Sequence, residues 1–153
     1  MKETKKIAEG KHYTAVDIGD PADIGQYSLI HAKSGQEIRG KLFLKGATGA
    51  TGTEISFTAI PPGSELGYFH RHGRVEETYI LLKGSGYCQV DGECFPVKAG
   101  SVVRVAPEGI RGLCNTSAEE MVYICIQSRE NSLEEHTYDD GTRVACTPAW
   151  VKR

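Results

Sequence analysis

The sequence predicts an all-β domain, a small antiparallel β-barrel with little helix. Glycine accounts for 18 of the 153 residues, well above its usual share of about 7%, which indicates many tight turns. Turn signals recur roughly every 8–12 residues between short apolar runs. No segment shows the apolar period of an amphipathic helix over ten residues or more. Short strands separated in this way favour a sandwich or a barrel.

The length fits a single domain over residues 1–153. Residues 1–27 carry turn signals and little periodicity, so we expect an N-terminal arm with one or two edge strands. The core of the barrel is expected at about residues 40–127. The tail, 128–153, holds at most one helical turn, at 132–136.

Strands are expected where β-branched, aromatic and aliphatic residues cluster between Gly or Pro breaks. Two short alternating runs fall within residues 28–45, and the small-residue stretch 46–53 is expected to be a flexible loop. The other strands are expected at 54–60, 66–72, 76–83, 101–106 and 121–127, with a hairpin over 87–97.

The Asp91-Gly92 dipeptide in that hairpin predicts a two-residue loop, which fixes the register of the two strands. It also places the sulfurs of Cys88 and Cys94 on opposite faces of the ribbon. The pairs implied by this register are Val90 with Glu93, Gln89 with Cys94, and Cys88 with Phe95.

Charge and cysteine usage exclude several classes of partner. A net charge of −2 excludes a chain-wide basic surface, so we expect no nucleic-acid partner. No apolar run approaches the ~18 residues of a membrane span, and no apolar signal segment follows the charged N-terminus. The five cysteines contain no CxxC pair. We therefore expect free, mostly buried thiols and a cytoplasmic location.

The most specific chemical signal is the run from His70 to Glu77, HRHGRVEE. The strand period of two places His70 and His72 on one face. Beyond a turn at Gly73, Glu77 and Tyr79 share one face of the next strand. Two imidazoles and one carboxylate that converge inside a barrel suit a divalent transition metal.

These residues belong to a longer pattern that resembles the cupin family. The first cupin motif matches at Gly63, His70, His72, Glu77 and Gly84. The second matches at Gly100, Pro107, Gly109 and Asn115. The third metal-binding histidine of the family is missing, and Arg111 or Gly112 stands in its place. The resemblance covers about residues 54–127 and implies a jelly-roll barrel, often dimeric, with its site inside.

Arg111 cannot replace that histidine, because a guanidinium has no lone pair to offer a metal. If its side chain points inward, its N–H donors suit a substrate carboxylate. If it points outward, it pairs with a surface carboxylate such as Glu108. The metal then has three protein ligands, His70, His72 and Glu77, and open positions. This donor set could hold Fe, Mn, Ni, Zn or Co.

Other side chains have more than one interpretation. Tyr79 is a catalytic candidate beside Arg111, as a donor to a bound ligand, or it only lines the barrel. Glu76 is expected to face solvent, unless a shorter turn makes it the ligand in place of Glu77. Glu54 and Arg104 are expected at the surface. The remaining histidines have no partner in spacing and are expected on the surface or in the core, unless one supplies a fourth ligand from an edge strand; they are His12, His31 and His136.

Three functions remain open. The first is a metal-dependent enzyme, a dioxygenase or a decarboxylase/isomerase, acting on a small carboxylate in the barrel. The second is a non-catalytic cupin module that binds or senses a small molecule. The third is a structural barrel with a remnant site. Because a small barrel must cover its strand edges, we expect a homodimer in which the N-terminal arm covers them.

Overall fold

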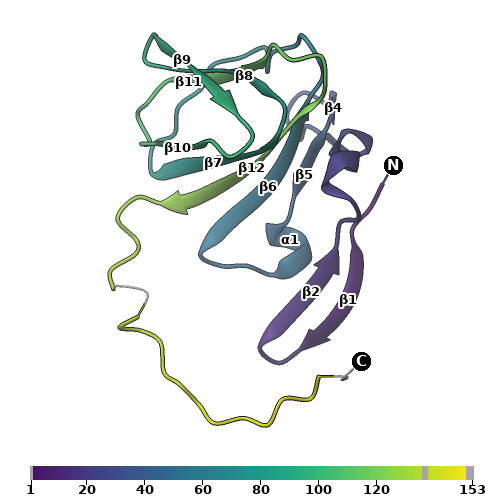
Figure 1. Cartoon of the computed structure of the whole chain (residues 1–153), viewed down its shortest axis with the longest axis vertical. Helices are drawn as coiled ribbons and strands as arrows, with labels where there is room; N and C mark the ends of the chain where they lie inside the picture. The colour runs from purple at the N-terminus through teal and green to yellow at the C-terminus, as the bar shows by residue number, and fades with distance from the viewer. Residues whose placement is uncertain (1, 136–137, 151–153) are drawn as a thin grey trace.

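The computed structural model describes residues 2–135 and 138–150. Within them the chain is mostly strand, with a 3-10 helix η1 and a four-residue helix α1 (Figure 1). In chain order the elements are β1 (Lys5–Gly10), β2 (Tyr13–Asp17), η1 (Pro21–Gln26), β3 (Ser28–Ile30), β4 (Glu37–Arg39), β5 (Lys41–Phe43), α1 (Lys45–Thr48), β6 (Thr53–Ile60), β7 (Val75–Lys83), β8 (Ser85–Val90), β9 (Glu93–Lys98), β10 (Val102–Val105), β11 (Arg111–Asn115) and β12 (Met121–Arg129). The prediction of an all-β fold with little helix is confirmed.

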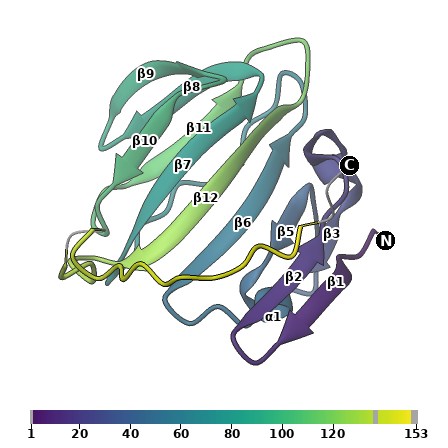
Figure 2. The same cartoon turned by 60° about the horizontal axis from the view of Figure 1, so that its bottom comes forward.

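Two antiparallel sheets face each other and form a jelly-roll body (Figures 1 and 2). The larger sheet has the strand order β10-β7-β12-β6-β5 and the smaller has the order β11-β8-β9. The main core fills the space between them. Its buried residues are Ile60, Tyr79, Leu81, Cys88, Val97, Val105, Leu113, Met121, Tyr123 and Cys125.

The opposite face of the larger sheet is covered by the N-terminal part of the chain. Ile24 of η1 is fully buried there, and Tyr27 packs with it against Ala59 and Val122. The β1–β2 hairpin projects beyond this contact, next to α1, and leaves the large side chains of Ile7 and Tyr13 exposed (Figure 2). The arm expected at residues 1–27 is therefore a hairpin followed by a 3-10 turn.

The β8–β9 hairpin has the predicted register. Asp91 and Gly92 both have positive φ, 50° and 89°, as a tight two-residue loop requires. Cys88 is buried in the core and Cys94 is exposed, so the two sulfurs lie on opposite faces. The expectation that the thiols are mostly buried is wrong, because Cys94 and Cys146 are both exposed.

The structure differs from the expected elements at two segments and adds one strand. Residues 66–72 form no strand, and the chain there meets the smaller sheet through isolated bridges at His70 and at the preceding Glu65. Strand β11 is not among the strands expected from the sequence. The expected loop at 46–53 begins within α1. Residues 132–135 are not helical, which agrees with the expected limit of one helical turn, and His136 lies outside the described residues.

No helix in the described part of the chain is long and apolar enough to cross a membrane.

Candidate metal centre

The two motif histidines lie on the irregular segment between β6 and β7, which the second motif holds in place. His70 exchanges two backbone hydrogen bonds with Arg111, of 3.2 and 3.0 Å. The backbone N–H of His72 donates to the carbonyl of Pro107 at 2.8 Å. Both imidazoles are thus positioned by backbone contacts, although their segment is not a regular strand.

Glu77 meets these histidines from β7. Its carboxylate is almost completely buried. His70 Nε2 lies 3.4 Å from Glu77 Oε2, and His72 Nε2 lies 3.2 Å from Glu77 Oε1. One ligand atom from each of the three residues falls within 4.8 Å of the others. The structure therefore brings together the three predicted metal ligands.

This donor set fits a divalent transition metal. Nitrogen and oxygen donors lie about 2 Å from such an ion, which separates neighbouring donors by about 3 Å. The spacing between the imidazole nitrogens and the carboxylate oxygens is close to that value. His72 Nε2 is buried beside Glu77 without a hydrogen bond. A buried nitrogen without such a partner suits a ligand atom.

Four further side chains converge on the Glu77 carboxylate. Oε2 accepts hydrogen bonds from Arg111 Nε, at 2.9 Å, and from the hydroxyl of Tyr79. Oε1 accepts from Gln127 Nε2 at 2.7 Å and from Cys125 Sγ at 3.4 Å. Burial alone would raise the pKa of Glu77. The contacts from His70, Gln127 and Tyr79 and the charge of Arg111 outweigh it and hold the pKa far below its usual range.

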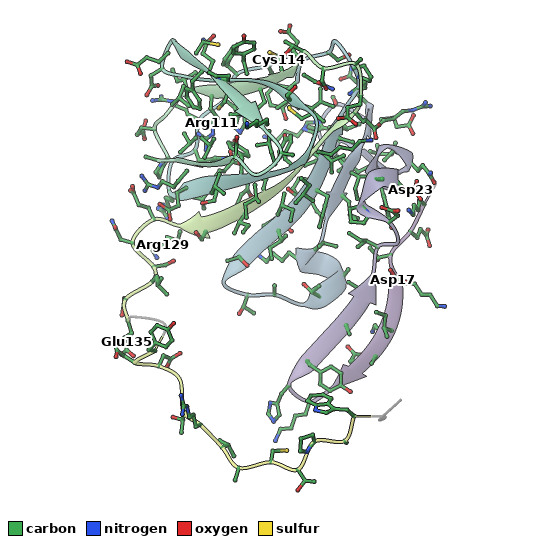
Figure 3. All side chains as sticks on the ribbon, in the orientation of Figure 1. Asp17, Asp23, Arg111, Cys114, Arg129 and Glu135 are labelled. Atoms are coloured by element: carbon green, nitrogen blue, oxygen red, sulfur yellow. The ribbon has the colours of Figure 1, made fainter. Side chains whose placement is uncertain are left out.

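Arg111 lies in the space between the two sheets (Figure 3) and is fully buried. Its Nη1 donates to the carbonyls of Pro107 and Gly109, at 3.2 and 2.8 Å. Nη2 is buried without a partner. The alternative in which Arg111 pairs with Glu108 at the surface is wrong, because Glu108 pairs with Arg71 at 2.7 Å.

The Tyr79 side chain is also buried, with its ring packed edge-on against Tyr123 at a centroid distance of 5.6 Å. Burial and the adjacent negative charge of Glu77 both raise the pKa of the Tyr79 hydroxyl. Tyr79 therefore stays protonated and donates to Glu77.

Sequence reasoning missed Gln127 and Cys125, the two contacts that β12 supplies. In the larger sheet Gln127 lies directly opposite Glu77, and Cys125 lies opposite Tyr79. The period of two along the strand predicted at 121–127 places Gln127, Cys125 and Tyr123 on the same face of that strand. What the sequence lacked was the pairing of β12 with β7, which decides that this face meets Glu77.

The other candidates lie outside the centre. Glu76 faces away from it and pairs with Arg104. Glu54 Oε1 accepts from the backbone N–H groups of Leu44 and Lys45, at 3.2 and 2.8 Å. Two of the remaining histidines are described, and both are exposed; they are His12 and His31.

The comparisons with known proteins agree with the fold and the motif. The model of the cupin domain family matches residues 56–127. The structure of a cupin protein from Bacteroides fragilis aligns with a TM-score of 0.66 and 33% identity, over 69% of this chain and 89% of that one. The chain belongs to the cupin superfamily. No protein with a curated description matches the sequence.

Two more distant structures share the fold. The plu4264 protein of Photorhabdus luminescens aligns with a TM-score of 0.56 and 16% identity, over 70% of this chain and 84% of that one. A predicted oxalate decarboxylase from Thermotoga maritima aligns with a TM-score of 0.55 and 22% identity, over 67% and 90%. At these identities the likeness concerns the fold alone.

Proposed function

We propose that this cupin holds one divalent transition metal at His70, His72 and Glu77 and acts as an enzyme on a small carboxylate bound inside the body. The observation that carries the proposal is the convergence of the three donor groups within 4.8 Å, at the inner side of the larger sheet. The reaction classes that fit are oxidation by a dioxygenase and decarboxylation or isomerisation.

A divalent ion held there would supply Lewis acidity or redox chemistry. The protein residues orient the acid and exclude water. Arg111, Tyr79 and Gln127 fix the Glu77 carboxylate from both of its oxygens. Arg111 Nη2 shares with Nε one edge of the rigid guanidinium fork. It is buried without a hydrogen-bond partner, and we assign its N–H groups to an oxygen of the substrate. Arg111 and Tyr79 are our catalytic candidates on this basis.

Metal analysis tests the proposal directly. The purified chain should contain one ion, and His72→Ala should lose it, because the variant removes one of three protein donors. His31→Ala is the matched control, since His31 lies at the surface and its ring contacts Ser34. Equal metal content in the native chain and in His72→Ala would remove the site that we assign.

A second candidate function is a binding module without turnover. The observation that favours it is the hydrogen bond from Arg111 Nε to Glu77 Oε2. Cupins with the third histidine have a further metal ligand in this part of the second motif. A carboxylate already neutralised by an arginine is a weaker donor to an ion. Incubation with small carboxylates separates the two functions, because an enzyme forms product and a binding module gives only stoichiometric binding.

The cellular setting is also a proposal. We place the protein in the cytoplasm, since all five cysteines are free thiols and reducing compartments maintain that state.

A further inference from the structure

A second polar cluster lies on the same face of the larger sheet as Glu77. Lys41 on the edge strand β5 donates to Ser56 Oγ at 3.1 Å and to Thr58 Oγ1 at 2.9 Å. Both hydroxyls belong to β6 and both residues are buried. We call these three residues the Lys41 cluster.

The register of the sheet connects the Lys41 cluster to the metal centre. Ser56 lies directly opposite Cys125 on β12, and Cys125 Sγ reaches Glu77 Oε1. Direct cross-strand partners project to one face with Cβ atoms about 5 Å apart. The Lys41 ammonium and the metal ligands are therefore separated by a distance on the order of 10 Å along one continuous polar strip.

The charge of Lys41 is not neutralised by a direct partner. Among the residues that the structure describes, no carboxylate lies within ion-pair distance of its ammonium, which contacts two neutral hydroxyls instead. Burial lowers the pKa of Lys41, and the negative charges of the same interior, Glu77 among them, oppose that shift. A partly buried cation with a free N–H and hydroxyls on either side is a ready acceptor site for an anionic group.

The Lys41 cluster lies at the open edge of the larger sheet, because β5 is its last strand. Its ammonium lies 4.8 Å from the ring centroid of Phe43, a side chain that is 43% exposed at the open edge of the sheet. Lys41 and Phe43 both line a groove along this edge. The Tyr68 ring, which is half exposed, stands 5.5 Å from the ring of His70 at the other end of the strip.

We propose that Lys41, together with Ser56 and Thr58, binds a second acidic group of the substrate, so that the substrate is a small dicarboxylate rather than a monocarboxylate. This inference rests on the proposed function, because the first carboxylate is assigned to the metal centre. One ammonium with two hydroxyls matches the single charge of a carboxylate. The separation of the two sites suits the length of glutarate better than that of oxalate.

Calorimetric titration of the Co²⁺-loaded protein tests this assignment. The probes are glutarate and pentanoate, which have the same chain length and differ by one carboxylate. Native protein should bind glutarate about tenfold more tightly or better, the usual scale of one charged hydrogen bond. Lys41→Met should bind glutarate no more tightly than pentanoate, with unchanged affinity for pentanoate and Co²⁺. Lys98→Met, at an exposed position of β9, is the matched control.

Two results would overturn the assignment in different ways. A native chain that binds no Co²⁺ refutes the metal centre and, with it, the bridged substrate. A variant Lys41→Met that binds Co²⁺ and glutarate as well as the native chain refutes the role of Lys41 alone, as does an equal loss of glutarate and pentanoate. If Lys41→Met fails to fold, Lys41→Gln removes the charge, can still donate to the two hydroxyls, and gives the same two readouts.

Discussion

At the scale of single residues, the pair of Arg111 and Glu77 distinguishes this site from the cupin motif that it resembles. The family pattern has a third histidine in the second motif, where this chain has Arg111 or Gly112, and the guanidinium of Arg111 is fully buried. Arg111 Nε lies 2.9 Å from the Glu77 carboxylate, and neither side chain is more than 4% exposed. The arginine therefore neutralises a buried carboxylate at the centre of the site.

Arg111→Met should lower the free energy of unfolding of the metal-free protein by about 3–5 kcal/mol, because it leaves a buried carboxylate without its cation. Added Co²⁺ should recover part of that loss, since the ion replaces the missing positive charge. Denaturant unfolding with and without Co²⁺ measures both effects.

Arg104→Met is the matched control for this experiment. It breaks an ion pair with Glu76 in which the arginine side chain is 49% exposed, and such pairs contribute about 0–1 kcal/mol. Equal losses in the two variants would contradict the structural role that we assign to Arg111.

The cysteines give a second test at this scale. Burial raises the pKa of the Cys88 thiol to about 11, and only the thiolate reacts with disulfide reagents. At pH 8 in native protein, Cys94 and Cys146 should react rapidly and Cys88 only after unfolding. The double variant Cys94→Ser/Cys146→Ser should lack the rapid phase. A rapid phase that persists in this variant would show that the interior opens readily.

At the scale of elements, β11 illustrates what sequence reasoning could not reach. Its residues, RGLCN, include a charged residue, a glycine and an asparagine, which are poor strand formers. The strand exists because β8 pairs with it along its whole length and because the motif segment bridges to it on its other side. Tertiary pairing of this kind overrides local propensity.

Asn115 at the end of β11 shows why the second motif persists without its histidine. Its Nδ2 lies within hydrogen-bond distance of the carbonyls of Ile60, Pro61 and Glu119, at 2.9, 3.0 and 2.7 Å. Its Oδ1 accepts from the backbone and the hydroxyl of Ser117. This residue ties the ends of β6 and β11 together, a structural task that is independent of any metal.

The contact between β8 and β11 predicts a strong effect at Gly86. A Cβ atom there would lie within 3 Å of the carbonyl of Cys114, which is backbone and cannot turn away. Gly86→Ala should therefore destabilise the protein by about 3 kcal/mol, the upper range for overpacking. Thermal or denaturant unfolding measures the change. Gly52→Ala, where nothing lies within 4 Å, should be nearly neutral, and similar values for both variants would disprove the close approach.

The expected strand at 66–72 failed for a related reason. Gly67 adopts a φ of +74°, which a regular strand does not use. The chain bends there, so that Phe69 packs over Gly112 while His70 returns to the backbone of Arg111. The apolar residues of this segment resemble a strand in sequence, but the segment meets the edge strand β11 only through isolated bridges.

At the scale of the whole molecule, the sequence predicted the class of fold and the three ligand residues. It did not predict the side chains that contact those ligands. The hairpin register and the spacing of His70, His72 and Glu77 are local properties, which turn chemistry and strand period determine. The contacts of Gln127 and Lys41 depend on which strands become neighbours in the larger sheet. Sequence periodicity assigns a residue to one face of its strand, but it does not show which strand becomes its neighbour in the sheet.

The whole chain also leads to a prediction about assembly. Strand β5 ends the larger sheet, and the projecting β1–β2 hairpin exposes Ile7 and Tyr13. We expect a homodimer that covers such edges. Light scattering should give twice the chain mass of 16.7 kDa. Deletion of the hairpin should shift the equilibrium to monomer, and a native protein that is monomeric at all concentrations would contradict the prediction.

The guanidinium of Arg111 affects the order in which the protein folds and binds metal. Because the chain supplies its own counter-charge to the buried acid, folding does not have to wait for an ion. If the centre takes up the metal that we propose, synthesis and loading would be separate steps. In this respect the protein would differ from small domains that fold only around their zinc.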